Sequence, residues 1–152
     1  SAASDVYKRQ EETSAEAVEK VELSEGSEHV IKMLNSGDGG QMIFEPAVIK
    51  VSVGDTIHFK ATDAAHNSVS VDGMVPSGAA SWASQLSQDI SITLDKEGVY
   101  VYQCDPHLIM AMVGVIQVGE AVNMDEIKSA ASSYSANFLM NNDRLQTYLN
   151  QL

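Results

Sequence analysis

Cysteine is almost absent from this sequence, because only one of its 152 residues is a cysteine. The chain therefore forms no internal disulfide, and its cysteine content does not identify a cellular compartment. No run of about eighteen apolar residues occurs, so we expect no segment to span a membrane. The sequence begins without a charged and then apolar leader, and we expect any export signal to lie outside this chain.

Basic residues are also scarce. Nine Lys and Arg stand against 21 Asp and Glu, which gives a formal net charge of −12 at pH 7. This balance argues against nucleic acid as a partner, because proteins that bind nucleic acid neutralise its phosphates with Lys and Arg.

The chain is long enough for one domain. With 44% hydrophobic residues it can bury a sizeable core, and we place a single domain at residues 28–152. Residues 1–27 differ, because they are rich in Glu and have almost no apolar periodicity. We interpret residues 1–27 as a disordered acidic arm. Residues 1–10 share no pattern with the acidic stretch after them, and we treat them as a candidate non-native segment.

Short segments rich in Val, Ile, Tyr and Thr, separated by turn residues, dominate residues 28–118 and predict a mostly β protein. We expect strands at 28–35, 47–53, 56–61, 67–71, 89–94, 98–104 and 113–118. Their number and spacing favour an antiparallel Greek-key β-sandwich.

After residue 118 the apolar residues change from the alternating period of strands to a helical one. Asn123, followed by Glu126, predicts the cap of one helix, and Ser135 predicts the start of a second that packs on the sandwich.

The single cysteine has candidate metal ligands close by. Cys104 is followed by His107, Met110 and Met112, and His66 lies well upstream. A thiolate, two imidazoles and a thioether form the ligand set of a mononuclear blue-copper centre, with two His and one Cys in a plane and a weak axial Met. At this point Met110 and Met112 are both candidates for the thioether.

The local sequence fits such a site. Pro106 favours the sharp turn that a loop needs to bring several ligands to one ion. His66 ends a polar stretch and precedes the alternating segment 67–71, so we place it at the edge of a strand, where a sheet would hold it.

Several segments resemble, in order and spacing, those of the pseudoazurin family of cupredoxins. They are Met33-Leu-Asn35, Met42-Ile-Phe-Glu-Pro-Ala47, Val53-Gly-Asp-Thr56, His66-Asn67, Met74-Val-Pro-Ser-Gly78, Gly98 to Tyr102, Cys104-Asp-Pro-His107 and Met110-Ala-Met-Val-Gly114. The resemblance covers about residues 28–150. It implies a cupredoxin fold with two C-terminal helices, one copper ion, and a periplasmic one-electron carrier that serves copper nitrite reductase, nitrous oxide reductase or cytochrome c.

The resemblance also implies roles for individual residues. The implied copper ligands are His66, Cys104, His107 and Met112. We favour Met112 over Met110 because the pseudoazurin loop resembles Cys-x2-His-x4-Met, whereas the shorter amicyanin loop, Cys-x2-His-x2-Met, selects Met110. Around the ligands we expect Asn67, Met42, Asp105 and Pro106. For the surface that docks partners we expect Pro46, Leu108, Ile109, Met110 and Ala111, which surround an exposed edge of His107.

The remaining histidines and methionines have simpler interpretations. We expect His58 to be a solvated strand residue and His29 to have no ligand partner. Met33, Met74, Met124 and Met140 are expected to pack in the core.

The charge departs from the family pattern. Pseudoazurins generally carry lysines around the exposed histidine, yet residues 73–88 contain no Lys or Arg. The sequence therefore does not predict that a basic face steers the partner.

Electron transfer is the leading hypothesis. A closed set of four ligands leaves no open position for a substrate, no second metal motif or nucleophile with its base is found, and we do not expect an enzyme. A shuttle that releases its partners quickly is most simply a monomer. The alternatives are a periplasmic copper-binding or copper-delivery protein, and a sandwich domain that no longer binds copper.

Overall fold

Two four-stranded sheets form the protein in the computed structural model, which describes residues 18–152. The first sheet has the order β2-β1-β4-β6, with β1 (Glu28–Gly37), β2 (Gly40–Glu45), β4 (Asp55–Lys60) and β6 (Ile90–Leu94). The second has the order β3-β8-β7-β5, with β3 (Val48–Val51), β5 (Val69–Ser70), β7 (Gly98–Gln103) and β8 (Val113–Val118). This arrangement confirms the predicted sandwich.

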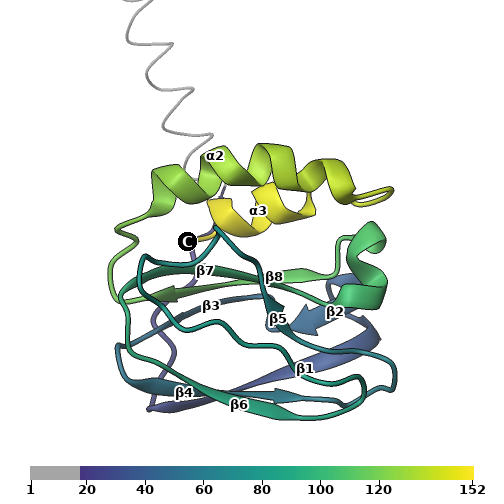
Figure 1. The fold of residues 1–152 in the computed structure, drawn as a ribbon, viewed down its shortest axis with the longest axis horizontal. Coiled ribbons are helices and arrows are strands. Elements are labelled where there is room, and N and C mark those ends of the chain that lie inside the picture. Colours follow the sequence, from purple (N-terminus) through teal and green to yellow (C-terminus); the bar gives the residue numbers. More distant parts are fainter. Residues whose placement is uncertain (1–17) are drawn as a thin grey trace, which may run out of the picture.

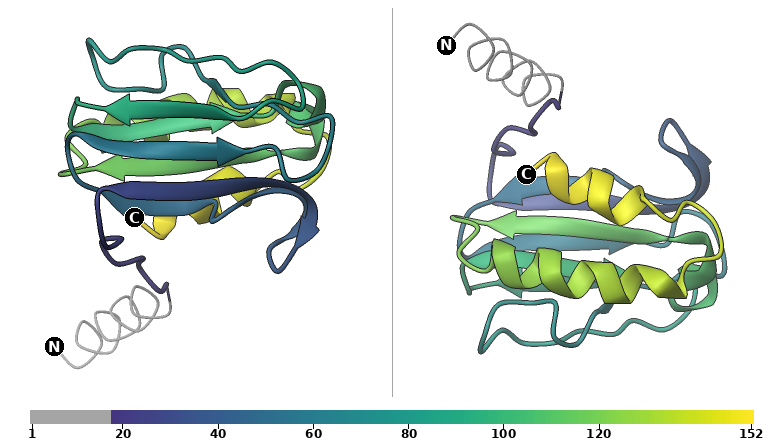
Figure 2. Two further views of the ribbon diagram at one scale, coloured as in Figure 1. Left: turned by 90° about the horizontal axis from the view of Figure 1, so that it is seen from below. Right: turned by 90° about the horizontal axis from the view of Figure 1, so that it is seen from above.

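Two helices, α2 (Met124–Tyr134) and α3 (Arg144–Asn150), cover the outer face of the second sheet (Figures 1 and 2). Short 3-10 segments, η1 (Asp105–Met110) and η2 (Ser135–Asn137), lie in the connections. Among residues 18–152, no helix has the length and apolar character that crossing a membrane requires.

Two clusters of buried side chains explain why the second sheet is the more apolar one. The first cluster fills the space between the sheets and includes Phe44, Phe59 and Tyr102. The second lies between the second sheet and the helices and includes Val99, Val101, Val113, Val115, Ile127, Leu145 and Leu149. Strands β7 and β8 are therefore buried on both faces, which accounts for their nearly continuous apolar sequence.

The strand predictions need two corrections. Strand β2 was not predicted, because its sequence combines glycine with Met42, which has a left-handed φ of 50°. The sheets are also mixed rather than wholly antiparallel, since β1 pairs with β4 and β3 pairs with β8 in parallel. These parallel pairs place the ends of β1 and β4, and the start of β8, at the same end of the sandwich.

The helix predictions also need correction. The first helix begins where predicted with Asn123 at the N-cap position, but the Asn123 side chain makes no capping hydrogen bond. The Asn123 amide instead accepts a hydrogen bond from the Val99 N–H at 2.7 Å and donates to the Val99 carbonyl at 3.0 Å. The second helix begins at Arg144 rather than Ser135, because Phe138 adopts an extended backbone and buries its ring in the second cluster. Residues 139–143 are therefore a loop.

Part of the expected acidic arm lies against the domain. The Val21 N–H donates to the Gln151 carbonyl at 2.8 Å, and the Ser24 N–H donates to the Lys50 carbonyl at 2.9 Å. Residues 1–17 lie outside the described part of the chain, so the disorder predicted for the arm as a whole stays a prediction.

Candidate metal centre

The loop between β7 and β8 brings Cys104 and His107 together. Strand β7 ends at Gln103, Cys104 follows, and η1 turns the chain back with Pro106 in its first turn. The His107 N–H donates to the Cys104 carbonyl at 3.2 Å, and the Met112 N–H donates to the His107 carbonyl at 3.2 Å. The Cys104 N–H closes the loop by donating to the Met112 carbonyl at 2.9 Å.

His66 reaches the site from the connection between β4 and β5, and it is completely buried. The loop at residues 84–88 holds it from outside. The Ser87 N–H donates to the His66 carbonyl at 2.8 Å, and the Ser87 hydroxyl accepts from the Ala65 N–H at 2.8 Å. The backbone around this ligand is thus fixed on both sides.

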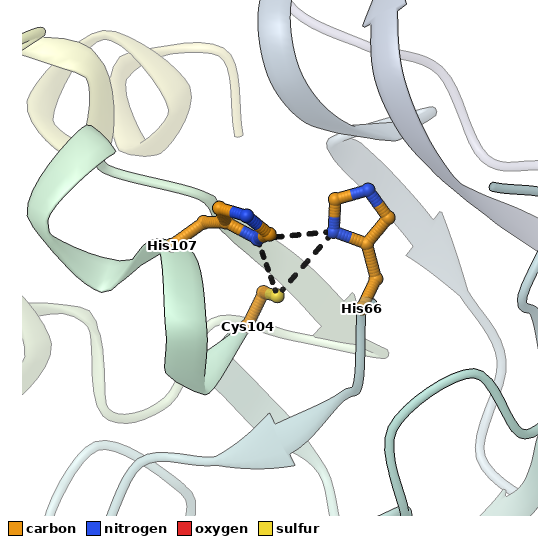
Figure 3. A group of neighbouring side chains, drawn as sticks. All are labelled: His66, Cys104 and His107. Carbon is orange, nitrogen blue, oxygen red and sulfur yellow. Dashed lines mark hydrogen bonds between the residues drawn. The ribbon is translucent and has the colours of Figure 1, made fainter. Parts of the chain in front are cut away.

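Three donor atoms converge between the two loops (Figure 3). The Cys104 Sγ lies 3.6 Å from His66 Nδ1 and 3.4 Å from His107 Nδ1, and the two Nδ1 atoms are 3.2 Å apart. An ion at the centre of this triangle would lie about 2 Å from each atom, close to the usual length of a metal–imidazole bond. Two imidazoles and a thiolate suit copper, so the residues present fit this ion.

Burial shifts the pKa of two donors, His66 and Cys104. Desolvation lowers the pKa of His66, the proximity of His107 lowers it further, and the Asp63 carboxylate acts in the opposite direction. A lowered pKa favours the neutral form of the His66 imidazole, which is the form that binds a metal. Burial raises the pKa of the Cys104 thiol, although backbone N–H groups of Asn67 and His107 donate to the sulfur and oppose this shift. Metal binding would thus release the thiol proton.

Asn67 joins the two ligand loops. Its Oδ1 accepts from the Asp105 N–H at 2.8 Å, and its Nδ2 donates to Asp105 Oδ2 at 3.2 Å and to the Ser84 carbonyl at 3.3 Å. Asp105 itself is exposed, and its Oδ1 accepts from Gln103 Nε2 at 2.9 Å. The segment that carries Cys104 is therefore braced from both loops.

Two contacts at the site were not expected from the sequence. Asn35 Oδ1 accepts a hydrogen bond from His66 Nε2 at 2.8 Å, although Asn35 lies within β1, whose sequence shows only plain alternation. The Tyr134 hydroxyl on α2 donates to Gln103 Oε1, which connects the helix to the strand leading into Cys104. Only the Met33-Leu-Asn35 segment of the resemblance pointed to Asn35, and nothing in the sequence pointed to Tyr134.

Met112 is fully buried in the core cluster that contains Cys104, whereas Met110 is half-buried beside the surface. The choice of Met112 over Met110 as the thioether ligand stays a prediction. Met42 packs partly buried against the same core cluster.

The predicted docking residues differ in exposure. Ile109 is 52% exposed, Pro46 is exposed, and Leu108 and Met110 are half-buried. Ala111 is completely buried, with φ of 58°, so it adds no area to this surface. Residues outside the prediction extend the surface, because the N–H groups of Leu139 and Met140 donate to the Ile109 carbonyl.

The residues predicted to lie outside the site mostly do so. His29 is buried against Asp55 and Ser24, and His58 contacts Ser91 and Glu28. Met33 and Met74 are core residues, and Met124 packs against the second cluster. The prediction for Met140 was wrong, because 48% of this residue is exposed in the loop that follows η2.

Residues 31–119 match the family described as copper binding proteins of the plastocyanin/azurin family. The chain belongs to this family of copper proteins, and copper is its cofactor. Within the family it groups with the pseudoazurins. Pseudoazurin of Methylorubrum extorquens is 42% identical over 105 residues, covering 69% of this chain and 70% of that protein. Pseudoazurin of Paracoccus pantotrophus is 40% identical over 103 residues, covering 67% and 71%.

The same relationship is found among solved structures. The crystal structure of native pseudoazurin from Hyphomicrobium denitrificans has a TM-score of 0.74 and 39% sequence identity. The match covers 82% of this chain and 98% of that one.

Proposed function

We propose that this chain is a type 1 blue copper protein that carries single electrons between redox proteins of the periplasm. The proposed ligands are His66, Cys104, His107 and Met112. The convergence of one thiol and two imidazole nitrogens between two hydrogen-bonded loops carries the proposal. The relatives named pseudoazurin support the same function.

The chain's own residues supply rigidity and insulation. Bound copper would supply a one-electron couple between Cu(II) and Cu(I). Because Asn67, Asn35 and Ser87 fix both ligand loops, the donor atoms need move little when the charge changes. Cys104 and His66 have no exposed area, so water is kept from the thiolate. His107 is only partly buried, and its ring would form the path for electrons to the surface.

Spectroscopy of the copper-loaded protein tests this function. An intense thiolate-to-copper absorption band that bleaches with ascorbate and returns on oxidation would support it, together with the matching electron paramagnetic resonance signal. Cys104→Ala should lose the band, whereas Met140→Ala, outside the donor set, should keep it. A colourless copper complex of the unaltered protein would contradict electron transfer and favour copper carriage.

A further inference from the structure

Carboxylates surround the end of the molecule that carries the metal centre. Figures 1 and 2 show η1, the β1–β2 hairpin and the loop between α2 and α3 at this same end. Five acidic residues lie in these segments, in the loop that follows β4 or directly before β6: Asp38, Asp63, Asp89, Asp105 and Asp143. Apart from Asp89, none of them forms an ion pair with another of residues 18–152.

The described residues place few cations near this end. Lys60 pairs with Asp89 at 3.4 Å, and Lys32 lies directly opposite Glu45 across β1 and β2. Arg144 is half-buried, and its Nη1 donates to the carbonyl groups of four residues, Gln41, Met42, Met110 and Ala111. With Glu45 included, six carboxylates therefore stand against three cations, Lys32, Lys60 and Arg144, at this end of the sandwich.

The centre of this acidic rim is apolar. Ile109, Leu139 and Met140 are 52%, 76% and 48% exposed. They form one patch, because the backbone of residues 139–140 is hydrogen-bonded to the Ile109 carbonyl and Asn141 Nδ2 donates to the Met110 carbonyl at 3.2 Å. An apolar centre with a charged rim is the usual form of a surface for brief protein association.

We infer that the redox partner of this protein is a basic protein, whose Lys and Arg side chains surround an apolar patch over its own redox centre. This inference rests on the proposed function and specifies its partner. The acidic rim would attract such a partner over several ångströms and orient the exposed edge of His107 toward it, while the apolar patch makes the contact. An acidic partner would be repelled.

The dependence of the electron-transfer rate on ionic strength tests the inference. The reduced copper protein is mixed in a stopped-flow instrument with a strongly basic c-type cytochrome, and separately with an acidic one of similar reduction potential. Between about 10 mM and 500 mM salt, we expect the rate constant with the basic cytochrome to fall about tenfold or more, since salt screens attraction. The rate constant with the acidic cytochrome should rise.

A pair of variants locates the effect. D38N/D143N removes two charges from the acidic rim, and E120Q/D125N removes two exposed charges from the opposite end of the sandwich. At low salt D38N/D143N should slow reaction with the basic cytochrome about threefold or more, and E120Q/D125N should change it by less than about half as much. Equal effects of the two double variants, or a rate that rises with salt, would overturn the inference.

The reaction is followed through the copper absorption band. This readout distinguishes a failure of the proposed function from a failure of the inference about the partner. Absence of the band before mixing would contradict the proposed function. A normal band and an unchanged reduction potential, with a rate for the basic cytochrome that is insensitive to salt, would contradict only the inference about the partner.

Discussion

Asn35 fixes the orientation of His66, because its side-chain oxygen accepts the hydrogen bond from Nε2 at 2.8 Å and leaves Nδ1 directed at Cys104 and His107. A partner of this kind selects the tautomer of a metal-binding histidine. Removing it should allow the ring to rotate or to place its proton on Nδ1.

Asn35→Ala is therefore expected to lower the affinity for copper by about 10- to 100-fold, the usual effect of losing such a partner. A competition titration with a copper chelator measures the affinity. Asn142→Ala, an exposed substitution in the neighbouring loop, should leave it unchanged. If Asn35→Ala binds copper as tightly as the unaltered protein, the orienting role of Asn35 is refuted.

Asp105 places a carboxylate between two of the proposed ligands, and its oxygens accept from Asn67 and Gln103. A negative charge close to the metal favours Cu(II) over Cu(I), so Asp105→Asn should raise the reduction potential by tens of millivolts. Cyclic voltammetry of the two proteins would measure the difference. Asp125→Asn removes the same charge at the far end of the molecule and should have a much smaller effect. An unchanged or lower potential in Asp105→Asn would refute this role.

Local spacing made much of the site predictable from the sequence. Cys104, Pro106 and His107 lie within one short loop, so the turn and the ligand types can be read together. Asn35 could not be found in this way, because 31 positions separate it from His66 and only the pairing of β1 with β4 brings them together. Tyr134 reaches Gln103 for a similar reason, through the packing of α2 on β7.

The fold was predictable in segments with a strong sequence period. It was less predictable where tertiary contacts, rather than the local sequence, determine the structure. Seven strands follow their Val- and Ile-rich segments, but apolar alternation does not distinguish parallel from antiparallel neighbours. The helix predicted to start at Ser135 is interrupted, because Phe138 adopts an extended backbone with its ring in the core and Leu139 is exposed. The free energy gained by burying one aromatic ring thus exceeded the free energy that one more turn of helix would contribute.

A buried pair away from the metal should give the apo-protein an acid-dependent stability. His29 Nε2 lies 2.8 Å from Asp55 Oδ2, and both residues are almost fully buried. Burial acts to raise the pKa of Asp55, but hydrogen bonds from His29 and from the Ser52 N–H, with the charge of His29, together hold it below its usual 3.8. A lowered pKa in the folded state stabilises the fold at pH values above the pKa of the unfolded chain.

The free energy of unfolding should therefore decline as the pH falls from about 5 through the lowered pKa of Asp55. Denaturant titrations of the apo-protein at a series of pH values measure this decline. Asp55→Asn weakens the hydrogen bonds that the carboxylate accepts from His29 and the Ser52 N–H, so it should destabilise the protein by about 1–3 kcal/mol at neutral pH and should reduce the decline. Asp125 is exposed, and Asp125→Asn should show the same decline of stability at acid pH as the unaltered protein. A pH profile that is unaltered in Asp55→Asn would assign the acid sensitivity to other groups.

Gly114 in β8 lies directly opposite Tyr102 in β7, and the aromatic ring occupies the space that a side chain at Gly114 would need. A Cβ there would overlap the Tyr102 ring and hydroxyl, and that ring is enclosed by Phe44 and Phe59 at centroid distances of 4.7 and 5.0 Å. Gly114→Ala should therefore lower the free energy of unfolding by about 1–3 kcal/mol, the usual cost of overpacking a core.

The same substitution should also affect the copper site, because Tyr102 precedes Cys104 by two residues and shares its core cluster. A broadened or shifted copper signal in electron paramagnetic resonance would report that displacement, alongside the loss of stability in denaturant titration. Gly39→Ala is the matched control, since the nearest atom to its added Cβ is 3.8 Å away. If Gly114→Ala is as stable as Gly39→Ala, the core around Tyr102 yields to the added methyl group, and close packing at Gly114 does not restrain the strand that leads to Cys104.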